Sequence, residues 1–201
     1  MRGGVMVARL PLEEKTLGPN PSPAARMKLN AKQLRKSIPS DNELKDLKRN
    51  PIYLVLDNII DTYNIGSLFR LADAIAAKKI YLCGEIEYPP SSRIHKAAVG
   101  TENWTPWEKC KSTLETVKKL KKNGVKIIAV EQHPHSISYS LLKPDFPCAI
   151  VVGNETTGIS ENVLKEADII VELPMLGINK SFNVWGSAAV VAYKILEGIE
   201  N

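Results

Sequence analysis

The stretch Leu173–Glu197, LPMLGINKSFNVWGSAAVVAYKILE, indicates the architecture of this chain more clearly than any other segment. A strand end and a short loop lead into a long, mostly apolar run, which predicts a terminal helix over about residues 182–198, buried on several faces. Ser181 and Asn183 stand where this helix is expected to begin. Their side chains can cap the helix, and they can equally donate to and accept from a ligand. The entrance of the helix is therefore either a simple cap or part of a binding site.

Upstream of this helix, short apolar runs alternate with stretches of helical spacing. The expected strands are residues 52–56, 79–83, 125–130, 148–152 and 169–173, and the other long helices are residues 64–77 and 112–123. Short helices are also expected near Ser160 and within residues 30–49. The strand segments are continuously apolar, which is typical of strands buried on both faces. The pattern predicts an α/β domain with a mostly parallel sheet flanked by helices.

Length and composition indicate a single globular domain. The chain has 201 residues, of which 44% are hydrophobic and 24% charged, as is ordinary for a domain with one core. Proline and glycine without periodicity predict a disordered extension over residues 1–27. Residues 28–50 form a short basic segment, and the folded domain is expected over residues 51–201.

The positive charge is concentrated at the N-terminal end of the chain. Residues 1–50 carry 11 basic and 5 acidic residues, a net charge of +6, whereas the remainder carries 16 basic and 17 acidic residues, a net charge of −1. A basic arm indicates a polyanionic partner such as nucleic acid, and a solvated tail explains it equally well. No apolar run is long enough for a membrane helix or a signal peptide, so no membrane partner is expected. Three cysteines without metal-ligand spacing complete the expectation of a cytoplasmic protein with reduced thiols.

The loop after the first expected strand carries unusual polar residues. In open α/β sheets, ligands lie beyond the carboxyl ends of the strands. Asn64 is expected to cap the following helix. Gly66 and Arg70 share a helical face opposite the apolar stripe, so Arg70 is expected at the surface. Gly66 weakens a helix unless another group must approach it closely.

The second loop of this kind is Gly153–Gly158, GNETTG. No Lys-Ser or Lys-Thr pair follows it, as a phosphate loop requires, and Glu155 stands where a dinucleotide loop has a glycine. Because a carboxylate repels phosphate, the loop suits a ligand with polar edges and no phosphate groups. Taken alone, the loop is more simply a tight turn with a helix cap.

A metal site is a weak candidate in this sequence. His133 and His135 are separated by a proline, and no further ligands accompany them. This spacing favours an ordinary loop, so no metal ion is expected.

A possible RNA contact lies in residues 91–100, SSRIHKAAVG, which precede Trp104 and Trp107. Arg93 and Lys96 could bind RNA phosphates while the aromatic rings stack on bases. A surface loop pinned by the tryptophans explains the segment equally well.

Three separated segments resemble, in order, motifs of the SpoU/TrmH family of SPOUT RNA 2′-O-ribose methyltransferases. They are residues 64–70 (NIGSLFR), 152–158 (VGNETTG) and 173–184 (LPMLGINKSFNV). The resemblance extends over residues 51–198 and is specific, because three separated motifs rarely coincide. It implies a C-terminal trefoil knot, a homodimer, and S-adenosylmethionine bound in the knot. The implied activity is methyl transfer to a ribose 2′-hydroxyl of tRNA or rRNA.

The same resemblance implies roles for individual residues. The residues expected to bind the cofactor are Val152, Gly153, Leu173, Met175, Gly177, Ser181 and Asn183. The residues expected to serve catalysis are Asn64, Arg70, Glu155, Ser181 and Asn183, with Arg70 also contacting RNA. An arginine has a pKa above about 12 and is a poor base at neutral pH. Arg70 is better suited to bind the adjacent phosphate and to stabilise developing negative charge.

The sequence departs from the family pattern in two places. Trp185 stands where the family usually has a small residue, so a bulky ring could either reshape the cofactor pocket or pack at a dimer interface. Many relatives carry a folded N-terminal RNA-binding domain, whereas only a short basic segment stands here. The alternative function is a non-catalytic RNA-binding or ribosome-assembly protein on the same fold, and Trp185 is its only support.

Overall fold

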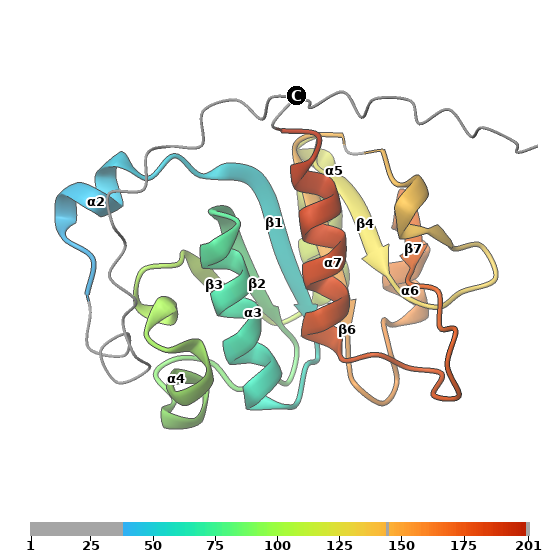
Figure 1. The fold of residues 1–201 in the computed structure, drawn as a ribbon, viewed down its shortest axis with the longest axis horizontal. Helices are drawn as coiled ribbons and strands as arrows, with labels where there is room; N and C mark the ends of the chain where they lie inside the picture. Colours follow the sequence, from blue (N-terminus) through green and yellow to red (C-terminus); the bar gives the residue numbers. More distant parts are fainter. Residues whose placement is uncertain (1–37, 144, 200–201) are drawn as a thin grey trace, which may run out of the picture.

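Seven parallel strands form one sheet in the order β3-β2-β1-β6-β4-β7-β5 (Figure 1). The structure is a computed structural model that describes residues 38–143 and 145–199. The strands are β1 Asn50–Asp57, β2 Ala77–Cys83, β3 Trp107–Cys110, β4 Lys126–Val130, β5 Ile137–Ser138, β6 Cys148–Gly153 and β7 Ile169–Glu172. The helices are α2 Asp41–Asp46, α3 Thr62–Ala74, α4 Ser92–Ala98, α5 Thr113–Lys122, α6 Glu161–Leu164 and α7 Val184–Leu196, with short 3-10 turns at Thr101–Asn103 and Tyr139–Leu141. The predicted α/β fold with a parallel sheet is confirmed.

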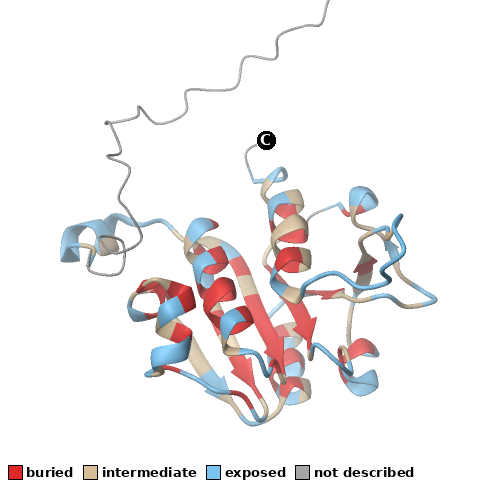
Figure 2. Cartoon of the chain, turned by 60° about the horizontal axis from the view of Figure 1, so that its bottom comes forward, coloured by how far each residue is buried: buried red, intermediate tan, exposed pale blue. Residues whose placement is uncertain are grey.

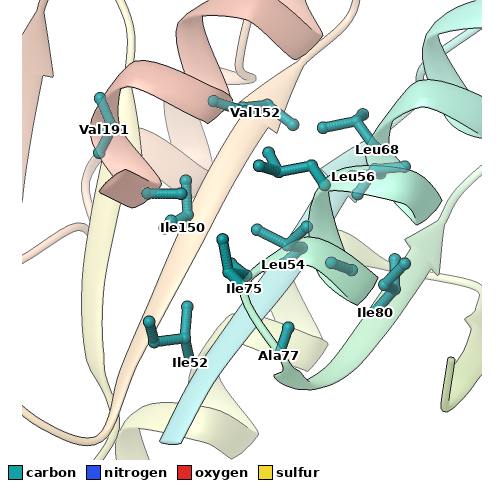
Figure 3. Close-up of a cluster of buried hydrophobic side chains, with 14 of the residues drawn as sticks. Ile52, Leu54, Leu56, Leu68, Ile75, Ala77, Ile80, Ile150, Val152 and Val191 are labelled. Carbon is teal, nitrogen blue, oxygen red and sulfur yellow. The ribbon is translucent and has the colours of Figure 1, made fainter. Parts of the chain in front are cut away.

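Helices cover both faces of the sheet and divide the core in two. Leu54 and Leu56 of β1 point into a cluster with α3, α4 and α7, whereas Val55 points into a cluster with α5 and α6. Figure 3 shows part of the first cluster, in which Leu68 of α3 and Val191 of α7 lie over the central strands. Because a strand alternates its side chains between faces, a strand covered on both faces is apolar over most of its length. β6 is buried at every position, and β1 is buried from Leu54 to Asp57, whereas its first residues are partly exposed (Figure 2).

The structure confirms the five expected strands and the three long helices and adjusts some of their ends. The first long helix ends at Ala74 rather than residue 77, because Ala76 adopts a positive φ of 47°. The short helices near Ser160 and within residues 30–49 are α6 and α2. Within the described ranges no helix is long and apolar enough to cross a bilayer. The proposed extension over residues 1–27, and residues 28–37 of the basic segment, lie outside the described residues.

Two strands and one helix were not predicted. β3, with the sequence WEKC, is a sheet edge with little apolar character, and β5 is only two residues long. α4 is a seven-residue helix within the segment proposed to contact RNA. Short edge elements of this kind are formed by tertiary pairing, and local sequence preference indicates them only weakly.

The expectation that Gly66 lies on an exposed helical face is wrong. Gly66 is buried where α3 packs against α4. A Cβ atom on this glycine would lie 2.6 Å from the Cβ of Ala97 and 2.7 Å from the backbone nitrogen of Ala98. The glycine therefore allows the two helices to approach closely, which accounts for its presence in a helix interior.

Replacing Gly66 with alanine is expected to lower the free energy of unfolding by about 1–3 kcal/mol, because backbone as well as side-chain atoms of α4 must move. Urea unfolding followed by circular dichroism measures this loss. Gly177→Ala is the matched control, because no atom lies within 4 Å of the added Cβ there. Equal stability of the two variants would contradict the packing argument.

Candidate functional site

A cavity of about 500 Å³ lies at the carboxyl ends of β4, β6 and β7, beside the start of α7. Parallel strands end at the same edge of a sheet, so these three strand ends meet there. Its lining residues are Val130, Glu131, Gln132, Val152, Gly153, Asn154, Glu155, Thr156, Gly158, Glu172, Leu173, Met175, Asn179, Lys180, Ser181, Phe182, Asn183, Val184 and Ser187. Two of the three motif segments identified from the sequence therefore converge on one cavity.

A chain of hydrogen bonds joins three of the predicted site residues. The side-chain amide of Asn183 donates to the Asn64 Oδ1 atom at 3.1 Å, and the amide of Asn64 donates to the Glu155 Oε1 atom at 2.8 Å. The residues come from α7, α3 and the loop after β6, which are separated by as many as 119 positions in the sequence. These two hydrogen bonds connect the cavity wall to the start of α3.

The expectation that Asn64 caps α3 is wrong. Asp61 is the N-cap, and its side chain accepts from the backbone N–H of Tyr63 at 2.8 Å. Asn64 instead lies within the first turn and is almost fully buried, with 2% of its surface exposed. A buried side-chain amide must find hydrogen-bond partners, and Glu155 and Asn183 provide them.

The carboxylate of Glu155 is held as an anion. Burial alone raises its pKa, but hydrogen bonds donated by the Asn64 amide and by the backbone N–H groups of Ile60 and Asp61 lower it, and the lowering prevails. Both backbone donors lie at 3.1 Å and belong to the N-terminal end of α3. Glu155 therefore acts as a fixed acceptor that links its loop to α3.

The Gly153–Gly158 loop is a tight turn, as the simpler interpretation proposed, and it also lines the cavity. Asn154 shapes the turn, because its Oδ1 atom accepts from the backbone N–H groups of Thr156 and Thr157 at 2.9 and 3.1 Å. A Cβ atom on Gly153 would lie 2.2 Å from the backbone of Gly158. The loop is therefore closed too tightly for a side chain at Gly153.

The capping interpretation of the α7 entrance is confirmed for Asn183, which also lines the cavity. Its Oδ1 atom caps the helix by accepting from the Trp185 N–H at 3.0 Å, while its amide group faces Asn64. Ser181 lies exposed on the cavity wall. The expectation that α7 is buried on several faces is wrong: one face is buried, but Tyr193 is 54% exposed and Trp185 36% exposed.

One of the residues predicted to bind the cofactor lies outside the cavity wall. Gly177 is not among the lining residues, in contrast to Val152, Gly153, Leu173 and Met175.

The predicted RNA-binding residues also lie away from the cavity wall. Arg70 is exposed on α3, and Arg93 and Lys96 are exposed on the neighbouring α4. Arg93 lies 3.9 Å from a carboxylate oxygen of Glu87, too far for strong pairing at an exposed site.

Sequence reasoning missed several polar residues of the cavity, among them Glu131, Gln132, Glu172 and Lys180. Glu131 and Gln132 follow β4, and Glu172 ends β7, so their position at strand ends was the signal available. Lys180 precedes the α7 entrance, and its carbonyl accepts from the Gln132 side-chain amide at 2.6 Å.

Two candidates remain, the His133–His135 pair and Trp185. His133 and His135 have ring centroids 5.3 Å apart, and the described part of the chain contains no cluster of three or more potential metal ligands. Trp185 does not line the cavity. Phe182 does, and its ring covers Gly186, where an added Cβ would lie 2.7 Å from the ring. The indole is therefore not a wall of the pocket.

Replacing Glu155 with glutamine is expected to remove a pH-dependent part of the stability. Since the pKa of Glu155 is lowered in the folded state, its contribution is present above the ordinary glutamate pKa of about 4.3 and is lost as the pH falls through the folded value. The difference in unfolding free energy between wild type and Glu155→Gln should shrink between about pH 5 and pH 3. Urea unfolding at each pH measures it. A flat profile for Glu155→Gln across this pH range would contradict the hydrogen-bond network.

Comparison with known proteins places this site in a described family. Residues 51–193 match the model of the SpoU rRNA Methylase family. The chain is 30% identical over 151 residues to the 23S rRNA (guanosine-2′-O-)-methyltransferase RlmB of Neisseria meningitidis serogroup B, a match that covers 75% of this chain and 60% of the relative.

Two solved structures share the fold. The TrmH/SpoU tRNA modifying enzyme of A. aeolicus aligns with a TM-score of 0.71 and 23% identity, covering 85% of this chain and 82% of the other. The AdoMet-bound rRNA methyltransferase from Sinorhizobium meliloti aligns with a TM-score of 0.69 and 23% identity, covering 82% and 59%. Because the family model spans most of the folded domain, from β1 into α7, the chain belongs to the SpoU rRNA methylase family.

Proposed function

We propose that this protein transfers a methyl group from S-adenosylmethionine to a ribose 2′-hydroxyl of tRNA or rRNA. The observation that carries the proposal is the hydrogen-bonded chain of Asn183, Asn64 and Glu155 at the rim of the cavity. The family assignment supports the same reaction, since the meningococcal relative is named a guanosine-2′-O-methyltransferase. The chain spans 60% of that relative, so the choice of RNA is left at the level of tRNA or rRNA.

The chemistry of the cavity fits this cofactor. Apolar side chains of Val130, Val152, Leu173 and Met175 can flank an adenine ring. The wall carries three carboxylates, from Glu131, Glu155 and Glu172, against one ammonium group, from Lys180. This balance disfavours a phosphate-bearing ligand and favours one with a sulfonium and an ammonium group.

The predicted binding residues divide between two ends of the cofactor. Backbone around Val152, Gly153, Leu173 and Met175 would hold the adenosyl group, with Gly177 giving the loop its turn. Ser181 and Asn183 would contact the end that carries the reactive methyl. The bound cofactor supplies an electrophilic methyl group on a positively charged sulfur.

The residues around the acceptor act by positioning and by charge. Asn64 and Asn183 are fixed by Glu155, so their amides can orient a ribose hydroxyl beside the cavity. Aligning the attacking oxygen with the methyl group is the main source of rate in such a transfer. Arg70 binds the phosphate next to the acceptor ribose and stabilises the negative charge that develops on its oxygen.

The RNA surface extends from α3 onto α4. Arg70, Arg93 and Lys96 are exposed on these adjacent helices, and among the described residues the ion pair found for this group is the long one between Arg93 and Glu87, at 3.9 Å. Residues 1–50, with a net charge of +6, supply further attraction for a polyanion. The cysteines Cys83, Cys110 and Cys148 are free, in agreement with the proposed cytoplasmic location.

A second copy of the chain is proposed to cover the exposed apolar side chains beside the site. These are Ile60, Tyr63, Phe182, Trp185 and Tyr193, between 36% and 68% exposed. They come from the N-terminal ends of α3 and α7 and from the outer face of α7, and the Asn64–Asn183 hydrogen bond holds the two helix ends together. A patch of large apolar side chains is typical of a protein interface. Trp185 is proposed to pack in this interface, which is one of the two roles expected for its ring. We also propose that the chain forms the C-terminal trefoil knot that the family resemblance implies.

Arg70→Ala is expected to reduce methyl transfer by roughly 100-fold or more while the affinity for S-adenosylmethionine stays within about twofold, because Arg70 lies outside the cavity wall. Radiolabelled methyl transfer to total tRNA and rRNA measures activity, and calorimetry measures cofactor affinity. Lys122→Ala on α5 removes an equal charge from the opposite face and should leave both unchanged. Full activity of Arg70→Ala would remove Arg70 from the mechanism, and failure of the wild type to bind the cofactor would remove the proposed function.

Tyr193→Arg is expected to shift the protein from dimer to monomer at micromolar concentration, since a charge in an apolar interface is costly to desolvate. Sedimentation velocity measures the shift. Leu141→Arg changes an apolar residue that is 67% exposed elsewhere and should leave the dimer intact. A wild-type protein that sediments as a monomer would overturn this arrangement.

A further inference from the structure

Glu131 is a cavity carboxylate to which the proposed function gives no role. It follows β4 directly and lies half-buried in the cavity wall. Its Oε1 atom accepts from the backbone N–H of Gln132, and its Oε2 atom accepts from the backbone N–H of Ile159, both at 2.9 Å. Two backbone donors therefore hold the carboxylate in one orientation.

The neighbouring loop is shaped around this carboxylate. Gly158 has a φ of 68°, and a Cβ atom there would lie 2.4 Å from the Oε2 atom of Glu131. An ionised carboxylate offers about four acceptor positions, and the two backbone N–H groups occupy one on each oxygen. One acceptor position on each oxygen remains, and the two oxygens are adjacent, as are the two hydroxyls of a vicinal diol.

The order of the strands places Glu131 between the two ends of the cavity. The strand order across this part of the sheet is β1-β6-β4-β7. The end of the cavity where methyl transfer is proposed lies beside β1 and β6, where Glu155 contacts the start of α3. The apolar residues Leu173 and Met175 follow β7. Glu131 directly follows β4, and this strand lies between them at the strand spacing of about 4.8 Å. A ligand whose adenosyl group lies between the ends of β6 and β7 has its ribose beside Glu131.

We propose that Glu131 binds the 2′- and 3′-hydroxyl groups of the cofactor ribose through its two carboxylate oxygens. This inference rests on the proposed function, because it takes the ligand to be an adenosyl compound. Glutamate and aspartate recognise ribose hydroxyls in this way at the carboxyl ends of strands in dinucleotide-binding folds. Neither of the other two cavity carboxylates is equivalent. Glu155 is occupied by α3, and no hydrogen bond fixes the side chain of Glu172 within the described residues.

The test compares S-adenosylhomocysteine with its 2′-deoxy and 3′-deoxy analogues by calorimetry. In the wild type, removal of either hydroxyl should weaken binding by roughly tenfold or more, as expected for a hydrogen bond to a charged acceptor. In Glu131→Gln, S-adenosylhomocysteine itself should bind more weakly, and the three ligands should differ by no more than about threefold. Glutamine keeps the shape of the side chain, and its carbonyl can still accept from the Ile159 N–H. Glu172→Gln is the matched control and should retain the full penalty for each missing hydroxyl.

The outcomes separate this inference from the function on which it rests. If S-adenosylhomocysteine and S-adenosylmethionine both fail to bind the wild type, the proposed function fails, and this inference with it. If they bind and the deoxy penalty is absent in the wild type, or persists undiminished in Glu131→Gln, Glu131 has no contact with the ribose and the function stands. If Glu131→Gln instead abolishes discrimination against S-inosylhomocysteine, Glu131 contacts the adenine amino group and the inference is overturned. Should the variant fail to fold, the wild-type ligand series alone can still contradict the proposal.

Discussion

The parallel pairing of β1 with β6 is the constraint on which the rest of the site depends. The register places Asp57 opposite Gly153, so both strands end at the same level and their following loops lie side by side. Hydrogen bonds then join the loops in both directions. Asp57 accepts from the N–H and hydroxyl groups of Ser160, and the Asn154 amide donates to the carbonyl of Asn58. Glu155 completes the connection by accepting from the start of α3.

This pairing explains why a rigid site can be assembled from loops. Loops ordinarily carry backbone donors that water must satisfy, but here the exposed N–H groups at the start of α3 are satisfied by a carboxylate from a different loop. The same carboxylate fixes Asn64, and Asn64 fixes Asn183. Glu155 and Asn183 also line the cavity, so the hydrogen bonds that join the loops also fix part of the cavity wall.

Close backbone approaches serve the same purpose. Gly66 brings α3 against α4, Gly153 and Gly158 close the turn after β6, and Gly186 accommodates the ring of Phe182. A side chain at any of these positions would push apart elements that the site requires to be adjacent. The glycines thus set the distance between segments, and this distance lets the polar residues form hydrogen bonds from one segment to another.

The fold was predictable from the sequence because the patterns that indicate its main strands and helices are local. Continuous apolar strands such as β6 and the amphipathic spacing of α5 depend on residues that are close together in the chain. Two of the motif segments contain residues that line the cavity, among them Glu155 and Asn183. Edge elements such as β3 escaped prediction, because their pairing partner rather than their own composition stabilises them.

The sequence by itself determined the α/β class, the order of the main elements and which loops carry polar residues. Only the tertiary structure decided how those polar residues are used. Asn64 has the sequence context of a helix cap, yet it is buried against a residue 91 positions away, and Asp61 caps the helix instead. Glu131 carries no motif, yet the strand order places it at the centre of the cavity wall. The physical reason is that a hydrogen bond between distant residues depends on strand register and on loop closure. Neither is encoded by a residue and its immediate neighbours.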